Sequence, residues 1–131
     1  DSLEWPRVLL IERNEADYLS NGVAKINAGN YHLVWKDNWE DGLAALLEGN
    51  FDVGLLDYRL ETRKGLDLIR RALAEGCRRP LILLTGHNDP TVDRKAIRAG
   101  AADYLIKDRV DADILERPIR HSLERQRALD A

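Results

Sequence analysis

Two hydrophobic patterns alternate along the chain. Short apolar runs that end abruptly at polar or turn-forming residues are typical of buried strands, and the segments between them carry Leu, Ile or Val at helical spacing. The clearest run leads up to Asp57, where apolar residues give way at once to a carboxylate. Strands are predicted at residues 7–11, 31–35, 51–57, 81–85 and 102–107.

Helices are predicted in the segments between these strands. Asn38 is the predicted N-cap of the second helix and Gly49 its stop, and Pro90 takes the first position of the fourth. Pro118 lies inside the last helix and predicts a kink. The five helices are expected after Asp17, after Asn38, around 66–73, from Pro90 to Ala99 and after Asp111.

Strands that alternate with helices specify an α/β domain with a parallel sheet and right-handed crossovers. Residues 1–131 form one domain, and residues 117–131 are the end of the last helix and a candidate connector to a further domain. Because the chain begins with Asp and contains no Met, we expect it to be part of a longer protein.

Composition excludes several classes of partner. A net charge of −3 gives no basic footprint, so nucleic acid is not an expected partner of this chain on its own. No apolar run approaches the ~20 residues of a membrane helix, and no signal peptide is recognisable. Cys77 is the only cysteine, so an internal disulfide is excluded, which suits a reducing compartment and a cytoplasmic location.

Polar side chains follow four of the predicted strands: Glu12, Asp57, Thr85 and Lys107. The carboxyl ends of parallel strands meet at one edge of the sheet, where functional groups collect. Two neighbouring carboxylates favour a divalent cation such as Mg²⁺, and a hydroxyl and an ammonium suit a transferred phosphoryl group. Each residue alone has a simpler interpretation, such as a turn Asp or a surface Lys, but the four together predict a site for phosphoryl chemistry.

The chain also resembles the receiver domains of bacterial response regulators over nearly its whole length. The similarity lies in residues 8–12, 55–60 with Gly65, 82–86 and 99–107. The resemblance implies a flavodoxin-like fold with strand order 2-1-3-4-5 and five helices. It also implies that Asp57 accepts a phosphoryl group from a phosphohistidine on a histidine kinase or phosphotransfer protein.

The resemblance assigns roles to further residues. Lys107 would pair with the phosphoryl oxygens, Thr85 would close onto them, and Tyr104 would change rotamer on phosphorylation, although it could equally be a core aromatic. Mg²⁺ would be held by Glu12, Asp57 and the backbone carbonyl of Arg59. In the family, the face formed by the fourth helix, fifth strand and fifth helix often mediates dimers. Its alternating charges here predict weak, salt-sensitive self-association at most; they are Asp93, Arg94, Arg98, Asp103, Lys107 and Arg117.

The sequence departs from the family pattern near this site. Arg13 replaces the second of two adjacent acids, which predicts weaker Mg²⁺ binding because a guanidinium cannot ligate the ion. Asp108 follows Lys107 where proline is usual, so we expect a trans bond. Glu61 also replaces a proline, which predicts a freer loop after Asp57. His87 lies where residues tune dephosphorylation, though a solvent-facing loop histidine is the simpler interpretation.

Three hypotheses follow. The first is a phosphoaccepting receiver, a signalling module rather than an enzyme. The second is a pseudo-receiver, in which Arg13 impairs Mg²⁺-dependent phosphorylation and the domain serves only for protein interaction. The third, a flavodoxin-like enzyme or nucleotide binder, would need a glycine-rich phosphate loop after the first strand, and residues 12–16 contain no glycine.

Overall fold

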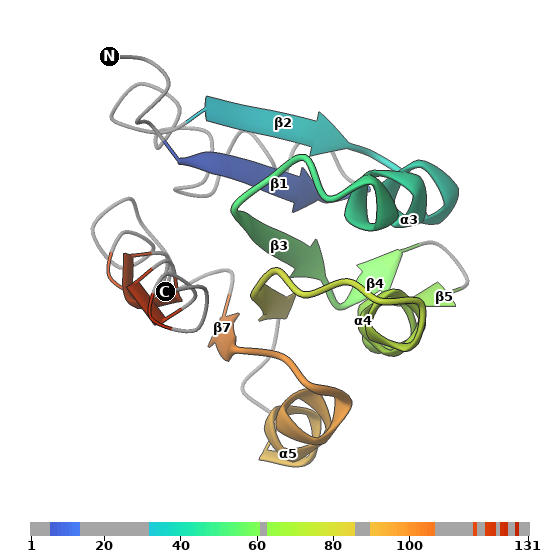
Figure 1. Ribbon diagram of the computed structural model, residues 1–131. Helices are drawn as coiled ribbons and strands as arrows, with labels where there is room; N and C mark the ends of the chain where they lie inside the picture. Colours follow the sequence, from blue (N-terminus) through green and yellow to red (C-terminus); the bar gives the residue numbers. More distant parts are fainter. Residues whose placement is uncertain are drawn as a thin grey trace.

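The computed structural model describes residues 6–13, 32–60, 63–85, 90–106, 117, 120–122, 124, 125 and 128. Five parallel strands form one sheet in the order β2-β1-β3-β6-β7, which confirms the predicted order 2-1-3-4-5 (Figure 1). The strands are β1 (Arg7–Ile11), β2 (His32–Lys36), β3 (Val53–Asp57), β6 (Leu81–Thr85) and β7 (Asp103–Ile106).

Each of the three inner strands is buried on both faces, because helices flank a parallel sheet on both sides. Alternate residues therefore enter two cores. One core, with Leu9, Ile11 and Leu56, packs against α3 (Trp39–Glu48), α4 (Gly65–Ala74) and α5 (Pro90–Ala99). Figure 1 shows these helices on one side of the sheet and the helical residues near the C-terminus on the other. The second core consists mainly of Val8, Leu10, Val53, Leu55, Ile82 and Leu84.

Strand limits differ little from the predictions. β1 and β6 match them, whereas β2 ends at Lys36, one residue later than predicted. β3 begins at Val53 rather than at residue 51, because Asp52 is a bend residue whose carboxylate accepts a hydrogen bond from the backbone N–H of Arg7 at 2.7 Å. The predicted helix after Asp17 and the beginning of the last helix, with Pro118, lie outside the described residues.

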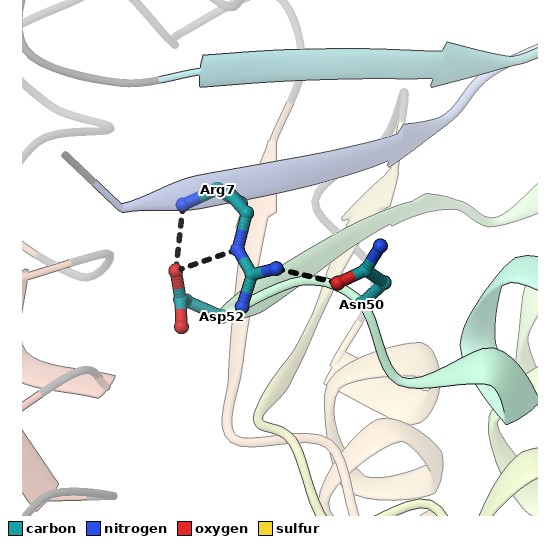
Figure 2. A network of polar contacts seen from close by, with 3 residues as sticks. All are labelled: Arg7, Asn50 and Asp52. Atoms are coloured by element: carbon teal, nitrogen blue, oxygen red, sulfur yellow. Dashed lines mark hydrogen bonds and ion pairs between the residues drawn. The ribbon is translucent and has the colours of Figure 1, made fainter. Parts of the chain in front are cut away.

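The amino end of the sheet is tied together by Arg7 (Figure 2). Its guanidinium donates to Asn50 Oδ1 at 2.5 Å, and its Nε lies 3.6 Å from Asp52 Oδ2. Both partners precede β3, so these contacts join the start of β1 to the start of its neighbour. The ion pair is partly exposed, and such pairs contribute at most about 1 kcal/mol. This end of the sheet lies opposite the strand ends that carry the candidate site.

The limits of α3 follow from the predicted capping residues. The side chain of Asn38 accepts a hydrogen bond from the backbone N–H of Asp41 at 2.8 Å, which satisfies one of the free donors of the first turn. Gly49 ends the helix in the left-handed conformation, with φ of 74°. Both caps were correctly predicted.

We expect Asn38→Ala to lower the free energy of unfolding by about 1 kcal/mol, because the Asp41 N–H loses its acceptor. Urea denaturation of the two proteins measures the difference. Asn38→Asp keeps an acceptor oxygen at the same place and should remain within about 0.5 kcal/mol of the parent. Equal losses in the two variants would show that the cap contributes nothing.

Cys77 follows α4 and is half-buried. Burial raises the pKa of its thiol, an effect that the backbone N–H and the positive charge of Arg79 offset only in part. The thiol therefore stays protonated near neutral pH and is a poor nucleophile.

Candidate functional site

The two acids of the predicted site lie next to each other at the carboxyl edge of the sheet. Ile11 pairs with Leu56 across β1 and β3, so Glu12 and Asp57 are the next residues of the two neighbouring strands. Glu12 is fully buried and Asp57 is 6% exposed. Buried carboxylates are costly unless they are paired, hydrogen-bonded or bound to a cation. Their position at the ends of paired strands explains why two acids 45 residues apart in sequence lie at one edge.

The end of β2 holds the backbone of Glu12. The Glu12 N–H donates to the carbonyl of Lys36 at 3.0 Å, and the indole N–H of Trp35 donates to the carbonyl of Glu12 at 2.6 Å. Both polar groups of the Glu12 backbone are therefore bonded to consecutive residues of one strand. The sequence did not indicate this contact, since Trp35 was predicted only as a strand residue.

Thr85 lies one strand further along the same edge. Asp57 pairs with Leu84 across β3 and β6, which places Thr85 one position beyond the aspartate. Its side chain is 3% exposed. The structure thus brings together three of the four predicted strand-end residues, whereas Lys107 lies outside the described residues.

Tyr104 lies on β7, opposite Leu83 of β6. It is half-buried and packs against the core that also contains Leu9, Ile11 and Leu56. This placement fits both interpretations of the residue, a core aromatic and a side chain that changes rotamer. Its predicted switching role stays a prediction.

The described residues after Asp57 form a short strand pair that the sequence did not predict. Arg59–Leu60 (β4) and Arg63–Lys64 (β5) pair as a two-stranded antiparallel sheet, and Leu60 is 1% exposed. The Gly65 N–H then donates to the carbonyl of Tyr58 at 2.7 Å. Glu61, where a freer loop was predicted, lies outside the described residues, whereas the residues on either side of 61–62 pair with each other and Leu60 is buried.

The backbone of Gly65 packs closely against the backbone of Asp57, the candidate phosphoacceptor. A Cβ atom at position 65 would lie 2.1 Å from the carbonyl oxygen of Asp57. Only glycine permits such an approach between two backbones. Gly65 belongs to the residues that carry the family resemblance, and this contact explains why the residue is glycine.

The structure describes only some of the remaining predicted site residues. Arg13 directly follows Glu12 but is exposed, and in the described part of the chain no ion pair joins it to Asp57. The Arg59 backbone begins β4, two residues after Asp57, while its side chain is not described. His87 lies outside the described residues. On the predicted dimer face, Arg94 and Arg98 are exposed on α5, and self-association through this face stays a prediction.

The donors at this edge fit a magnesium ion. Glu12 and Asp57 offer carboxylate oxygens, and backbone carbonyls of the following loop are further hard ligands. Within the described residues no group of three or more His, Cys, Asp or Glu side chains could hold a metal. The described residues of the site offer two carboxylates, and carbonyls, water or phosphoryl oxygens can take further ligand positions, a mixture typical of Mg²⁺.

A family model described as the response regulator receiver domain matches residues 8–118. Among curated relatives, the transcriptional regulatory protein QseB of Escherichia coli O157:H7 is 30% identical over 103 residues, 77% of this chain and 46% of that protein. The response regulator protein PmrA of Pseudomonas aeruginosa is 40% identical over 84 residues, 61% of this chain and 37% of that protein. This chain thus spans about half or less of the relatives that it matches.

Solved structures share the fold. The CheY-like receiver domain protein of Methanospirillum hungatei JF-1 superposes with a TM-score of 0.83 at 23% identity, covering 95% of this chain and 98% of that one. The signal receiver domain of an HD domain-containing protein from Pseudomonas fluorescens Pf-5 has a TM-score of 0.83 at 25% identity, covering 95% and 91%. Because the family model spans most of the chain, the chain belongs to the response regulator receiver domains, the signalling modules of two-component systems.

Proposed function

We propose that this domain accepts a phosphoryl group on Asp57 from a phosphohistidine of a histidine kinase or phosphotransfer protein. The observation that carries the proposal is the juxtaposition of Asp57 with Glu12, which follows one neighbouring strand, and with Thr85 at the end of the other. Membership of the receiver family supports it independently, since receiver domains interact with such donors.

The proposed transfer assigns a task to each residue. A carboxylate oxygen of Asp57 attacks the phosphorus atom, the bond to the imidazole nitrogen of the donor breaks, and the imidazole leaves with the bonding electrons and takes up a proton. The product is an acyl phosphate on Asp57. The Thr85 hydroxyl would donate to a phosphoryl oxygen, and Lys107 would pair with another. Such transfer depends on positioning and charge neutralisation, which rigid strand ends supply.

Receiver domains typically use Mg²⁺, and here Glu12, Asp57 and the Arg59 carbonyl would hold it. When bound, the ion neutralises charge on the phosphoryl oxygens. The task of Glu12 is to provide a carboxylate at a fixed place. Its burial supports this role, because a fully buried acid directly after a paired strand has little freedom to move away.

A second candidate function is a pseudo-receiver that acts in protein interaction without phosphorylation. The observation in its favour is Arg13 in place of an acid, which leaves the described part of the site with two carboxylates. Beryllofluoride with Mg²⁺, which imitates a phosphoryl group on a carboxylate, distinguishes the two. We expect amide resonances of Asp57, Thr85 and Tyr104 to shift, whereas an unchanged spectrum favours the pseudo-receiver.

Covalent modification tests the assignment of Asp57. After incubation with acetyl phosphate and Mg²⁺, we expect one phosphoryl adduct, located on Asp57 by mass spectrometry. Asp57→Asn should abolish it, because the amide is a poor nucleophile. Asp52→Asn is the matched control, since Asp52 lies at the opposite end of β3, and it should leave the adduct unchanged. An adduct that survives Asp57→Asn would contradict the assignment.

The curated relatives named above are, by their names, a transcriptional regulatory protein and a response regulator. We propose that this chain is likewise the receiver part of a longer response regulator.

A further inference from the structure

We infer that Trp35 is a positioning residue for the metal site: its indole N–H sets the orientation of the Glu12–Arg13 peptide. The inference rests on the proposed function, because it concerns the acid proposed to hold Mg²⁺. It adds a residue of β2, a strand that contributes none of the site residues predicted from the sequence.

The contact itself is specific. Nε1 of Trp35 lies 2.6 Å from the Glu12 carbonyl oxygen and is the only N–H of an indole ring. The ring packs against the second core, beside residues such as Val8 and Leu10, which limits its freedom to turn. Leu10 is also the strand partner of Trp35, so the ring extends from this pair toward the residue after β1.

The acceptor matters because of its place in the chain. The Glu12 carbonyl belongs to the peptide that joins Glu12 to Arg13, and Ile11 is the last residue of β1. Beyond the strand, two bonds from β2 hold the Glu12 backbone, one from its N–H to Lys36 and one from the indole to its carbonyl. The first orients the peptide before Glu12, and the second orients the peptide after it.

Two consequences follow for the site. The two hydrogen bonds fix the peptides on both sides of Glu12, so the direction of its Cα–Cβ bond is also fixed. The position of the buried carboxylate is restricted as a result. The same peptide plane also sets the direction in which Arg13 leaves the strand, and its side chain is exposed. Loss of the indole bond would loosen the position of Glu12 and the direction in which the chain continues to Arg13.

Loss of this hydrogen bond is expected to lower Mg²⁺ affinity through the position of Glu12. Removal of a hydrogen bond that orients a metal-binding residue typically lowers metal affinity by about tenfold or more. An aliphatic or phenyl side chain at position 35 would retain most of the packing but could not donate. We therefore expect Trp35→Phe to weaken Mg²⁺ binding about tenfold.

The test compares the unaltered chain, Trp35→Phe and Trp39→Phe by Mg²⁺ titration followed through backbone amide shifts, with urea denaturation of each protein. Trp39→Phe is the matched control, because it removes the same atoms from the other core. We expect weaker Mg²⁺ binding only in Trp35→Phe, with a loss of stability no larger than in the control. In the unaltered chain, the Trp35 indole resonance should shift over the same Mg²⁺ range as the Glu12 amide.

The outcomes separate the two proposals. Absence of Mg²⁺ binding in the unaltered chain would overturn the metal site itself, and the role of Trp35 with it. Binding that is equal in the unaltered chain and Trp35→Phe would overturn only the role of Trp35. If Trp35→Phe does not fold, the indole resonance decides: one that stays fixed while the Glu12 amide shifts would overturn the inference.

Discussion

Gly65→Ala is expected to destabilise the domain by about 3 kcal/mol, the upper end of the usual cost of overpacking. The added Cβ would lie 2.1 Å from the Asp57 carbonyl oxygen, well inside van der Waals contact. Neither backbone can yield easily, because Asp57 ends a fully buried strand and Gly65 begins α4. Relief of the clash requires the end of β3 or the start of α4 to move.

This movement would also disturb the candidate phosphoacceptor. We expect Gly65→Ala to lose the beryllofluoride response under conditions in which it is still folded. Urea denaturation measures the stability and amide shifts measure the response. The contrast is Gly49→Ala, where φ is 74° but no atom lies within 4 Å of the added Cβ, so only conformational strain of about 1–2 kcal/mol applies. Similar losses of stability in the two variants, with the response intact in Gly65→Ala, would contradict the steric argument.

Arg13→Asp is expected to strengthen Mg²⁺ binding by at least about tenfold, equivalent to ~1.4 kcal/mol. The substitution removes a positive charge next to Glu12 and adds an oxygen ligand, so both effects have the same sign. A unit pair at ~4 Å interacts by about 4 kcal/mol at an effective dielectric of 20 before desolvation is subtracted. Because Arg13 is exposed, solvent screens its charge, and we expect the added ligand to be the larger effect.

Arg13→Ala separates the two effects, since it removes the charge without adding a ligand. We expect its Mg²⁺ affinity to lie between those of the parent and Arg13→Asp, and closer to the parent. Titration followed by amide shifts measures all three, and low salt should enlarge the difference between parent and Arg13→Ala. Equal affinities in all three proteins would mean that position 13 points into solvent and that Glu12 and Asp57 bind the ion without its influence.

The pattern of the sequence was sufficient for the sheet and for part of the site. Apolar runs such as 7–11 and 81–85 predicted β1 and β6 correctly, because strands buried on both faces must be continuously hydrophobic. The neighbourhood of Glu12, Asp57 and Thr85 was predictable for a related reason. Each residue directly ends or follows such a run, and parallel strands align their carboxyl ends at one edge.

Tertiary structure alone decided what supports those residues. The Trp35 indole meets the Glu12 carbonyl, and Gly65 meets the Asp57 carbonyl, only because strand register and helix packing bring separate segments within contact distance. The pairing of β4 with β5 similarly depends on cross-strand register, which the short segment 59–64 does not encode in a hydrophobic period. Periodicity records which face of an element is buried, whereas these contacts depend on distances between elements, and those distances are set by the packed fold.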